Sequence, residues 1–159
     1  MTLRKTNWRT YAFWILLTEA VGLVSGLLAR EGIRLYTETA VKPPLTPPAW
    51  VFPLAWTLLY ALMGAAAARI FLRPRGPERR RSLTLYLVQL GVNFFWSVIF
   101  FRWRLYAGAF LWLLGLWGLV LWLLLRLRRQ DPAGARLLLP YQLWLTFAAY
   151  LNLGVVLLN

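Results

Sequence analysis

Long apolar runs, each followed by a short polar or basic stretch, divide the chain into five segments. Each run has about the twenty residues that an α-helix needs to cross a bilayer. We therefore predict an all-α integral membrane protein in which residues 1–159 form a single domain, one bundle of five transmembrane helices. The predicted helices cover residues 11–29, 49–72, 82–101, 105–125 and 137–158.

The connector between the first two predicted helices, residues 30–45, is polar and too long for a tight turn. Loops of this length in compact folds are often lids or binding elements. It leads into a proline-rich entry to the second helix, with Pro43, Pro44, Pro47 and Pro48. Prolines cannot donate backbone hydrogen bonds and bias the preceding residues toward extended conformations, so we expect the second helix to begin near Ala49.

Polar and aromatic positions recur at helical spacing inside the predicted helices. Trp56 and Tyr60 share one face of the second helix, because residues four apart in a helix lie above one another. Gln89 and Asn93 begin a similar stripe on the third helix, and buried amides must face protein rather than lipid. The fifth helix places Tyr141, Trp144, Ala148 and Asn152 in one arc. We expect these three stripes to surround one cavity beneath the first loop.

Composition supports the membrane assignment and narrows the chemistry. The sequence is 60% hydrophobic and only 14% charged, which leaves too little polar surface for a soluble domain. The absence of Cys and His removes disulfides, thiol nucleophiles, histidine acid–base catalysis and the usual zinc or haem ligands. With five acidic residues, a carboxylate metal cage is also unfavourable. We predict no catalytic residues, no metal and no intrinsic cofactor.

The net charge of +13 lies in short clusters between the apolar runs, not along an aromatic-interleaved face. This pattern favours basic loops beside lipid headgroups over nucleic-acid binding. Lys and Arg number 13 on the side of the N-terminus and 5 on the opposite side. In a bacterial inner (plasma) membrane, the positive-inside rule then predicts a cytoplasmic N-terminus.

Two features of the first predicted helix leave alternatives open. Glu19 lies inside the apolar run, where a carboxylate is costly and should face protein. It is either a structural hydrogen-bond partner of a neighbouring helix or the titrating group of a small proton-coupled exporter, although the internal repeats typical of transporters are absent from the sequence. Gly22 and Gly26 form a Gly-x-x-x-Gly step, which suits either packing within the bundle or a homodimer.

Three stretches carry a family resemblance: the run from Lys42 to Gly64, residues 89–101, and residues 140–152. In this order they resemble the second, third and fifth helices of the translocator protein (TspO/MBR) family, the tryptophan-rich sensory proteins or peripheral benzodiazepine receptors. The resemblance covers the chain from Tyr11 to Asn159. It implies a first loop that caps a ligand pocket, with protoporphyrin IX or a related tetrapyrrole as ligand and sterols as a further class. The expected ligand-binding residues are Trp50, Trp56, Tyr60, Gln89, Asn93, Trp144 and Ala148.

The resemblance implies a membrane receptor or binding protein that acts in sensing, sequestration or transport. For Trp50 the alternative is an aromatic anchor at the membrane interface, and for Trp56 it is packing within the bundle. A further alternative is light- and oxygen-dependent porphyrin breakdown, which some family members are said to promote. Because the sequence shows no acid–base constellation, such turnover would be photochemistry of the bound porphyrin shaped by the pocket. We therefore expect a binding protein rather than an enzyme.

Overall fold

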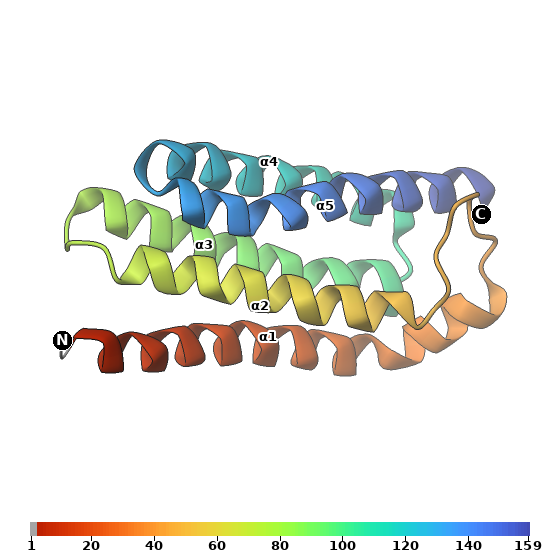
Figure 1. The fold of residues 1–159 in the computed structure, drawn as a ribbon. Helices are drawn as coiled ribbons and strands as arrows, with labels where there is room; N and C mark the ends of the chain where they lie inside the picture. Colours follow the sequence, from red (N-terminus) through yellow and green to blue (C-terminus); the bar gives the residue numbers. More distant parts are fainter. Residues whose placement is uncertain (1–2) are drawn as a thin grey trace.

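The computed structural model describes residues 3–159, with side chains from Asn7 onward, and is a bundle of long helices lying side by side (Figure 1). Five of its helices are long and apolar enough to cross a membrane, which confirms the predicted fold class. The elements are α1 (Leu3–Thr39), α2 (Val51–Phe71), α3 (Pro77–Ser97), the π-helical segment η1 (Val98–Arg102), α4 (Tyr106–Gln130) and α5 (Pro132–Leu158).

Neighbouring helices close a ring in the order α1, α2, α5, α4 and α3, and η1 packs against α1. The turns α2–α3 and α4–α5 lie at the same end of the bundle as the start of α1, and we call this the basic end (Figure 1). The α1–α2 connection and the end of α5 lie at the opposite end, which we call the loop end. The side chains of Arg4 and Lys5, which entered the charge count, lie outside the described residues.

Helix α1 is much longer than predicted, because it begins at Leu3 instead of residue 11 and because residues 30–39 are helical and not part of a loop. Arg34 pairs with Glu31 and Glu38 at helical spacing, which supports this polar part of the helix only weakly because all three side chains are exposed. Tertiary contacts contribute more: a Cβ on Gly32 would overlap the backbone of η1, so α1 and η1 approach very closely there. The lid loop, as we name residues 40–50, is therefore shorter than expected.

The other helix boundaries also require correction. Helix α2 begins at Val51 instead of residue 49, and α3 begins at Pro77 instead of residue 82. Helix α4 starts at Tyr106 and continues to Gln130, whereas we had expected it to end at residue 125. Helix α5 begins at Pro132, not at residue 137. The basic stretches had been assigned to connectors, but the helices extend into them. Helices α3 and α5 each begin with a proline, which is well tolerated in the first turn of a helix.

Candidate functional site

A cavity of about 740 Å³ lies at the loop end, between α1, α2, the end of α3, η1 and α5, with the lid loop along one side. This volume falls within the range of about 300–1,000 Å³ that small-molecule sites occupy. Helix α1 contributes aliphatic and glycine positions, and the lid loop contributes Lys42, Thr46 and Pro47. The remaining wall is mostly aromatic, and we call the whole the aromatic cavity. Its rings come from Tyr36, Phe52, Trp56, Tyr60, Trp96, Phe100, Phe101 and Trp144.

The indoles of Trp56 and Trp144 meet where α2 faces α5. Their ring centres are 6.2 Å apart with planes at 81°, an edge-to-face contact. Phe52 lies edge-on to Trp144 at 6.0 Å, and Tyr60 lies at 5.4 Å from Trp56. Aromatic pairs favour such geometries, so each ring holds its neighbour in place. The wall therefore offers fixed indole surface to a flat apolar molecule.

A buried chain of hydrogen bonds lies behind the aromatic wall. The Tyr60 hydroxyl donates to Asn93 Oδ1 at 2.9 Å, and Asn93 Nδ2 donates to the Tyr141 hydroxyl at 2.8 Å. The Tyr141 hydroxyl donates in turn to Gln89 Oε1 at 3.0 Å, while Gln89 Nε2 has no acceptor among the described residues. Because both amides are almost fully buried, this chain fixes the orientation of Tyr60 rather than contacting the cavity directly.

The structure separates the seven predicted site residues into three groups. Trp56, Tyr60, Trp144 and Ala148 line the aromatic cavity together. Gln89 and Asn93 face inward as expected, but they lie in the layer behind Tyr60. Trp50 precedes the first residue of α2, is 68% exposed and does not line the cavity. Its exposure fits the interface alternative better than a place in the pocket.

Sequence reasoning missed the part of the wall that η1 contributes. Phe100 and Phe101 line the cavity and pack against Tyr36 of α1, with ring centres 5.4 Å apart in both pairs. Trp96 Nε1 donates to Asn152 Oδ1 at 3.2 Å and ties this wall to α5. The sequence did contain one indication of this wall: Phe100 follows Trp96 by four residues and so extends the third-helix stripe by one turn.

The lid loop is held by three hydrogen bonds to α5 and to Asn159, the residue that follows it. Asn159 Nδ2 donates to the Val41 carbonyl at 2.8 Å, and the Val41 amide donates back to Asn159 Oδ1 at 3.0 Å. The Tyr150 hydroxyl donates to the Pro44 carbonyl at 2.7 Å. Prolines leave this segment with few backbone donors, so the bonds from α5 supply much of what fixes it over the cavity.

The two glycines of the Gly-x-x-x-Gly step have different surroundings. A Cβ at Gly22 would overlap the ring of Tyr60, whereas a Cβ at Gly26 would meet nothing within 4 Å. Both glycines line the cavity. Within this chain, Gly22 makes room for the Tyr60 side chain and Gly26 faces open space, and neither makes room for the backbone of a second helix.

Glu19 also lines the cavity, from α1. Its carboxylate forms no hydrogen bond or ion pair with the residues from 7 to 159. The structural hydrogen bond to a neighbouring helix, which was one interpretation of Glu19, is therefore not formed within this part of the chain. The group instead places a carboxylate at an otherwise apolar surface of α1, next to Ala20 and Leu23.

Comparison with known proteins gives consistent matches along nearly the whole chain. The model of the TspO/MBR family matches residues 14–158. The chain is 32% identical to "Tryptophan-rich protein TspO" of Chlorobaculum tepidum, over 94% of this chain and 96% of that protein. It is 37% identical to "Protein CrtK" of Rhodobacter capsulatus over 74% of each chain. It is also 37% identical to "Translocator protein" of Ovis aries, over 77% of this chain and 73% of that protein.

Proposed function

Since the chain belongs to the TspO/MBR family, we propose that it is a membrane protein that binds a tetrapyrrole such as protoporphyrin IX in the aromatic cavity. The observation that carries the proposal is the pair of fixed indoles, Trp56 and Trp144, on the wall of a cavity of about 740 Å³. A macrocycle buries a large flat apolar area, which stacks well against aromatic rings. Sensing, sequestration and transport all begin with this binding step.

The polar groups at the rim suit the acidic edge of such a ligand. Lys42 Nζ donates to the Thr37 carbonyl at 3.0 Å and lies 5.2 Å from the centre of the Tyr36 ring. This places a positive charge on the lid loop, beside the cavity. A ligand carboxylate at this rim could form a charge-assisted hydrogen bond with the ammonium group. Sterols, which lack the charge, would use only the apolar walls.

Tryptophan fluorescence tests the proposal directly. Protoporphyrin IX is titrated into detergent-purified wild-type protein, Trp56→Phe, Trp144→Phe and the control Trp122→Phe, whose ring is 55% exposed outside the cavity. We expect saturable quenching, with affinity lower by roughly two- to tenfold in the two cavity variants, the factor for an aromatic contact of about 0.5–1.5 kcal/mol. Equal affinity in all four proteins would refute binding in the aromatic cavity.

The unpartnered carboxylate of Glu19 favours a second candidate, a small proton-coupled exporter. A titrating group on a cavity wall within the membrane is what such a mechanism needs. Proteoliposomes containing wild-type protein or Glu19→Gln distinguish the two functions. The exporter requires porphyrin efflux that depends on a pH gradient and disappears in Glu19→Gln, while the binding protein keeps its affinity in that variant and moves no porphyrin along the gradient.

Orientation in the membrane is part of the same proposal. The turns with most of the arginines lie at one end of the bundle, together with the start of α1 (Figure 1). For a bacterial inner membrane, the positive-inside rule puts this basic end in the cytoplasm and the lid loop outside. Thiol labelling from outside the cell, with single cysteines in place of Leu45 and of Arg75, distinguishes the two orientations. Only the cysteine at position 45 should react.

A further inference from the structure

A second hollow, of about 610 Å³, lies at the basic end, at the opposite end of the bundle from the aromatic cavity. Helices α3 and α4 border it. Four of its lining residues carry charges, namely Glu78, Arg126, Arg128 and Arg129, and Leu125 and Gln130 complete it. We call it the basic pocket.

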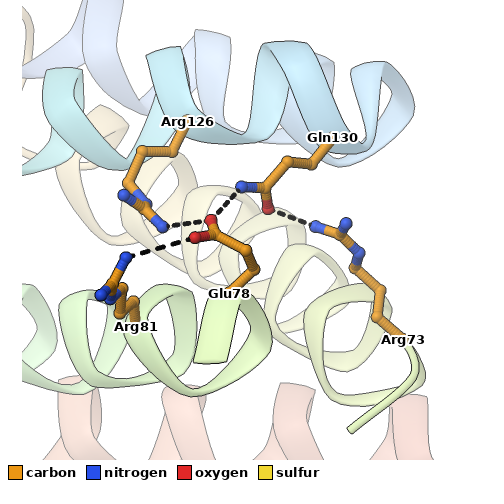
Figure 2. Close-up of polar contacts among 5 residues, drawn as sticks. All are labelled: Arg73, Glu78, Arg81, Arg126 and Gln130. Carbon is orange, nitrogen blue, oxygen red and sulfur yellow. Dashed lines mark hydrogen bonds and ion pairs between the residues drawn. The ribbon is translucent and has the colours of Figure 1, made fainter. Parts of the chain in front are cut away.

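The carboxylate of Glu78 is fully used inside the pocket (Figure 2). Its Oε2 accepts hydrogen bonds from Arg126 Nη2 and from Gln130 Nε2, both at 2.6 Å. Its Oε1 accepts one from Arg81 Nη1 at 3.3 Å. Gln130 is in turn held by Arg73, whose Nη1 donates to Gln130 Oε1. The negative charge of Glu78 is thereby offset by its own neighbours, which reduces its repulsion of an incoming anion.

Positive charge remains after this compensation. Arg128 and Arg129 line the pocket, are exposed, and form no hydrogen bond or ion pair with the described part of the chain. The Nε of Arg126 is buried and likewise has no acceptor there. Guanidinium groups bind phosphate through two parallel hydrogen bonds, a geometry that few other side chains offer. Arg128 and Arg129 thus present unused donors suited to a phosphate group.

One border of the pocket is apolar and leads toward the membrane-facing surface of α4. Leu125 lines the pocket and is 47% exposed. Trp122 lies three residues earlier, on the same side of the helix, and is 55% exposed. A free phosphate ion gains nothing from this surface, whereas an acyl chain attached to the phosphate would cover it. The combination of basic rim and apolar border indicates a lipid as the occupant.

We propose that the basic pocket binds the headgroup of an anionic phospholipid of the phosphatidylglycerol type, with Arg128 and Arg129 at the phosphate and an acyl chain along Leu125 and Trp122. The site is separate from the aromatic cavity and does not depend on which ligand that cavity takes. It holds one lipid in a fixed position, which differs from the diffuse attraction that any basic protein surface exerts on an anionic bilayer.

Native mass spectrometry of the full chain in detergent tests the proposal. Phosphatidylglycerol and phosphatidylcholine with the same acyl chains are added separately to wild type, to Arg128→Gln/Arg129→Gln, and to the control Arg75→Gln/Arg80→Gln. The control removes the same charge from two other exposed arginines at the basic end that lie outside the pocket. We expect one tightly held phosphatidylglycerol on wild type. Its affinity should fall roughly twenty-five-fold in the pocket variant, about fivefold per arginine, and less than about twofold in the control.

A second variant tests the apolar border without changing charge. Leu125→Ser should weaken phosphatidylglycerol binding several-fold, and lipid-free thermal unfolding of every variant shows whether the fold is intact. Equal losses in the pocket variant and its control would overturn the proposal in favour of diffuse attraction. Equal binding of the two lipids would overturn it in favour of apolar contact alone. Displacement of the lipid by glycerol 3-phosphate at equal concentration would assign the pocket to a soluble anion.

Discussion

The two ends of this bundle use the same helices to opposite effect. At the loop end, α2 carries Phe52, Trp56 and Tyr60, and the helices stand far enough apart to enclose the aromatic cavity. Toward the basic end, the same helix continues as Gly64 followed by four alanines, and here it touches the backbone of α1. The distance between packed helices depends on the side chains at the contact, and small residues permit the closest approach.

The difference shows how one sequence makes a closely packed basic end, called the rigid base below, and an open loop end, called the hollow top. The half of α2 at the basic end is in contact with protein on nearly every side. Its completely buried residues include Met63, Ala66, Ala67 and Ala68. An ion pair closes the base, because Arg69 Nε and Nη2 donate to the two oxygens of Asp131, both at 2.8 Å. The cavity can therefore stay open without loosening the bundle, since the stabilising contacts are concentrated below it. Three predictions test this division, from the largest expected effect to the smallest.

The same substitution should have opposite consequences in the two halves. A Cβ at Gly64 would lie 2.5 Å from the Cα of Ile15, so Gly64→Leu forces α1 and α2 apart and should lower the free energy of unfolding by about 3 kcal/mol. At Gly26 a Cβ meets nothing within 4 Å, and Gly26→Leu should change stability by less than about 1 kcal/mol because the cavity accepts the side chain. Thermal unfolding in detergent compares the two variants, and equal destabilisation would show that the loop end is as tightly packed as the base.

The ion pair at the base makes stability depend on pH. The hydrogen bond from Arg69 holds the pKa of the Asp131 carboxyl below its usual value, against an opposing effect of burial. A carboxyl with a lowered pKa binds fewer protons in the folded than in the unfolded protein, so the stability it adds is complete above the unfolded pKa of about 4 and is lost as the pH falls through the folded value.

Asp131→Asn should therefore cost about 1–2 kcal/mol at neutral pH, a low value for a charged hydrogen bond because the Arg69 side chain is 36% exposed. The stabilities of the two proteins should converge as the pH falls below about 4 and through the lower pKa of the folded carboxyl, where wild type protonates Asp131 and loses the pair. Glu78→Gln at the same end is the comparison variant. Because the Glu78 side chain is 52% exposed, the loss of its ion pairs should cost less stability than Asp131→Asn. A gap between wild type and Asp131→Asn that persists in acid would mean that the asparagine disturbs packing rather than the ion pair.

Much of the loop end could be predicted from sequence, because its aromatic and polar residues recur at helical spacing. Spacing and family motifs together identified Trp56, Tyr60, Trp144 and Ala148, which line one cavity. Periodicity alone gives a direction and not a depth, so Asn93 was expected at the cavity and lies one layer behind it. Trp50 precedes the first turn of α2, where no periodicity yet applies.

The missed extension of α1 has a different cause. Residues 30–39 are polar, and their local composition is that of a connector. They are helical because Gly32 and Tyr36 fit against η1, a contact with residues some seventy positions away. A short apolar run with Phe100 and Phe101 gave no sign that it would be π-helical or that it would meet this part of α1. Such tertiary contacts override local preference and are not visible in a single sequence.

The smallest expected change in stability is Ala148→Thr on the cavity wall. Ala148 is 8% exposed and lies on the cavity surface of α5 beside Trp144, so the added atoms should enter open space and cost less than about 1 kcal/mol of stability. The same atoms occupy volume that a flat ligand needs, and we expect affinity for protoporphyrin IX to fall roughly tenfold, which corresponds to about 1.4 kcal/mol of binding.

Ala107→Thr, at an exposed position of α4, is the matched control and should change neither quantity. Fluorescence titration and thermal unfolding of the same samples separate the two effects. If Ala148→Thr lost stability but kept its affinity, the wall at α5 would belong to the packed part of the bundle, and the division between a rigid base and a hollow top would fail at this helix.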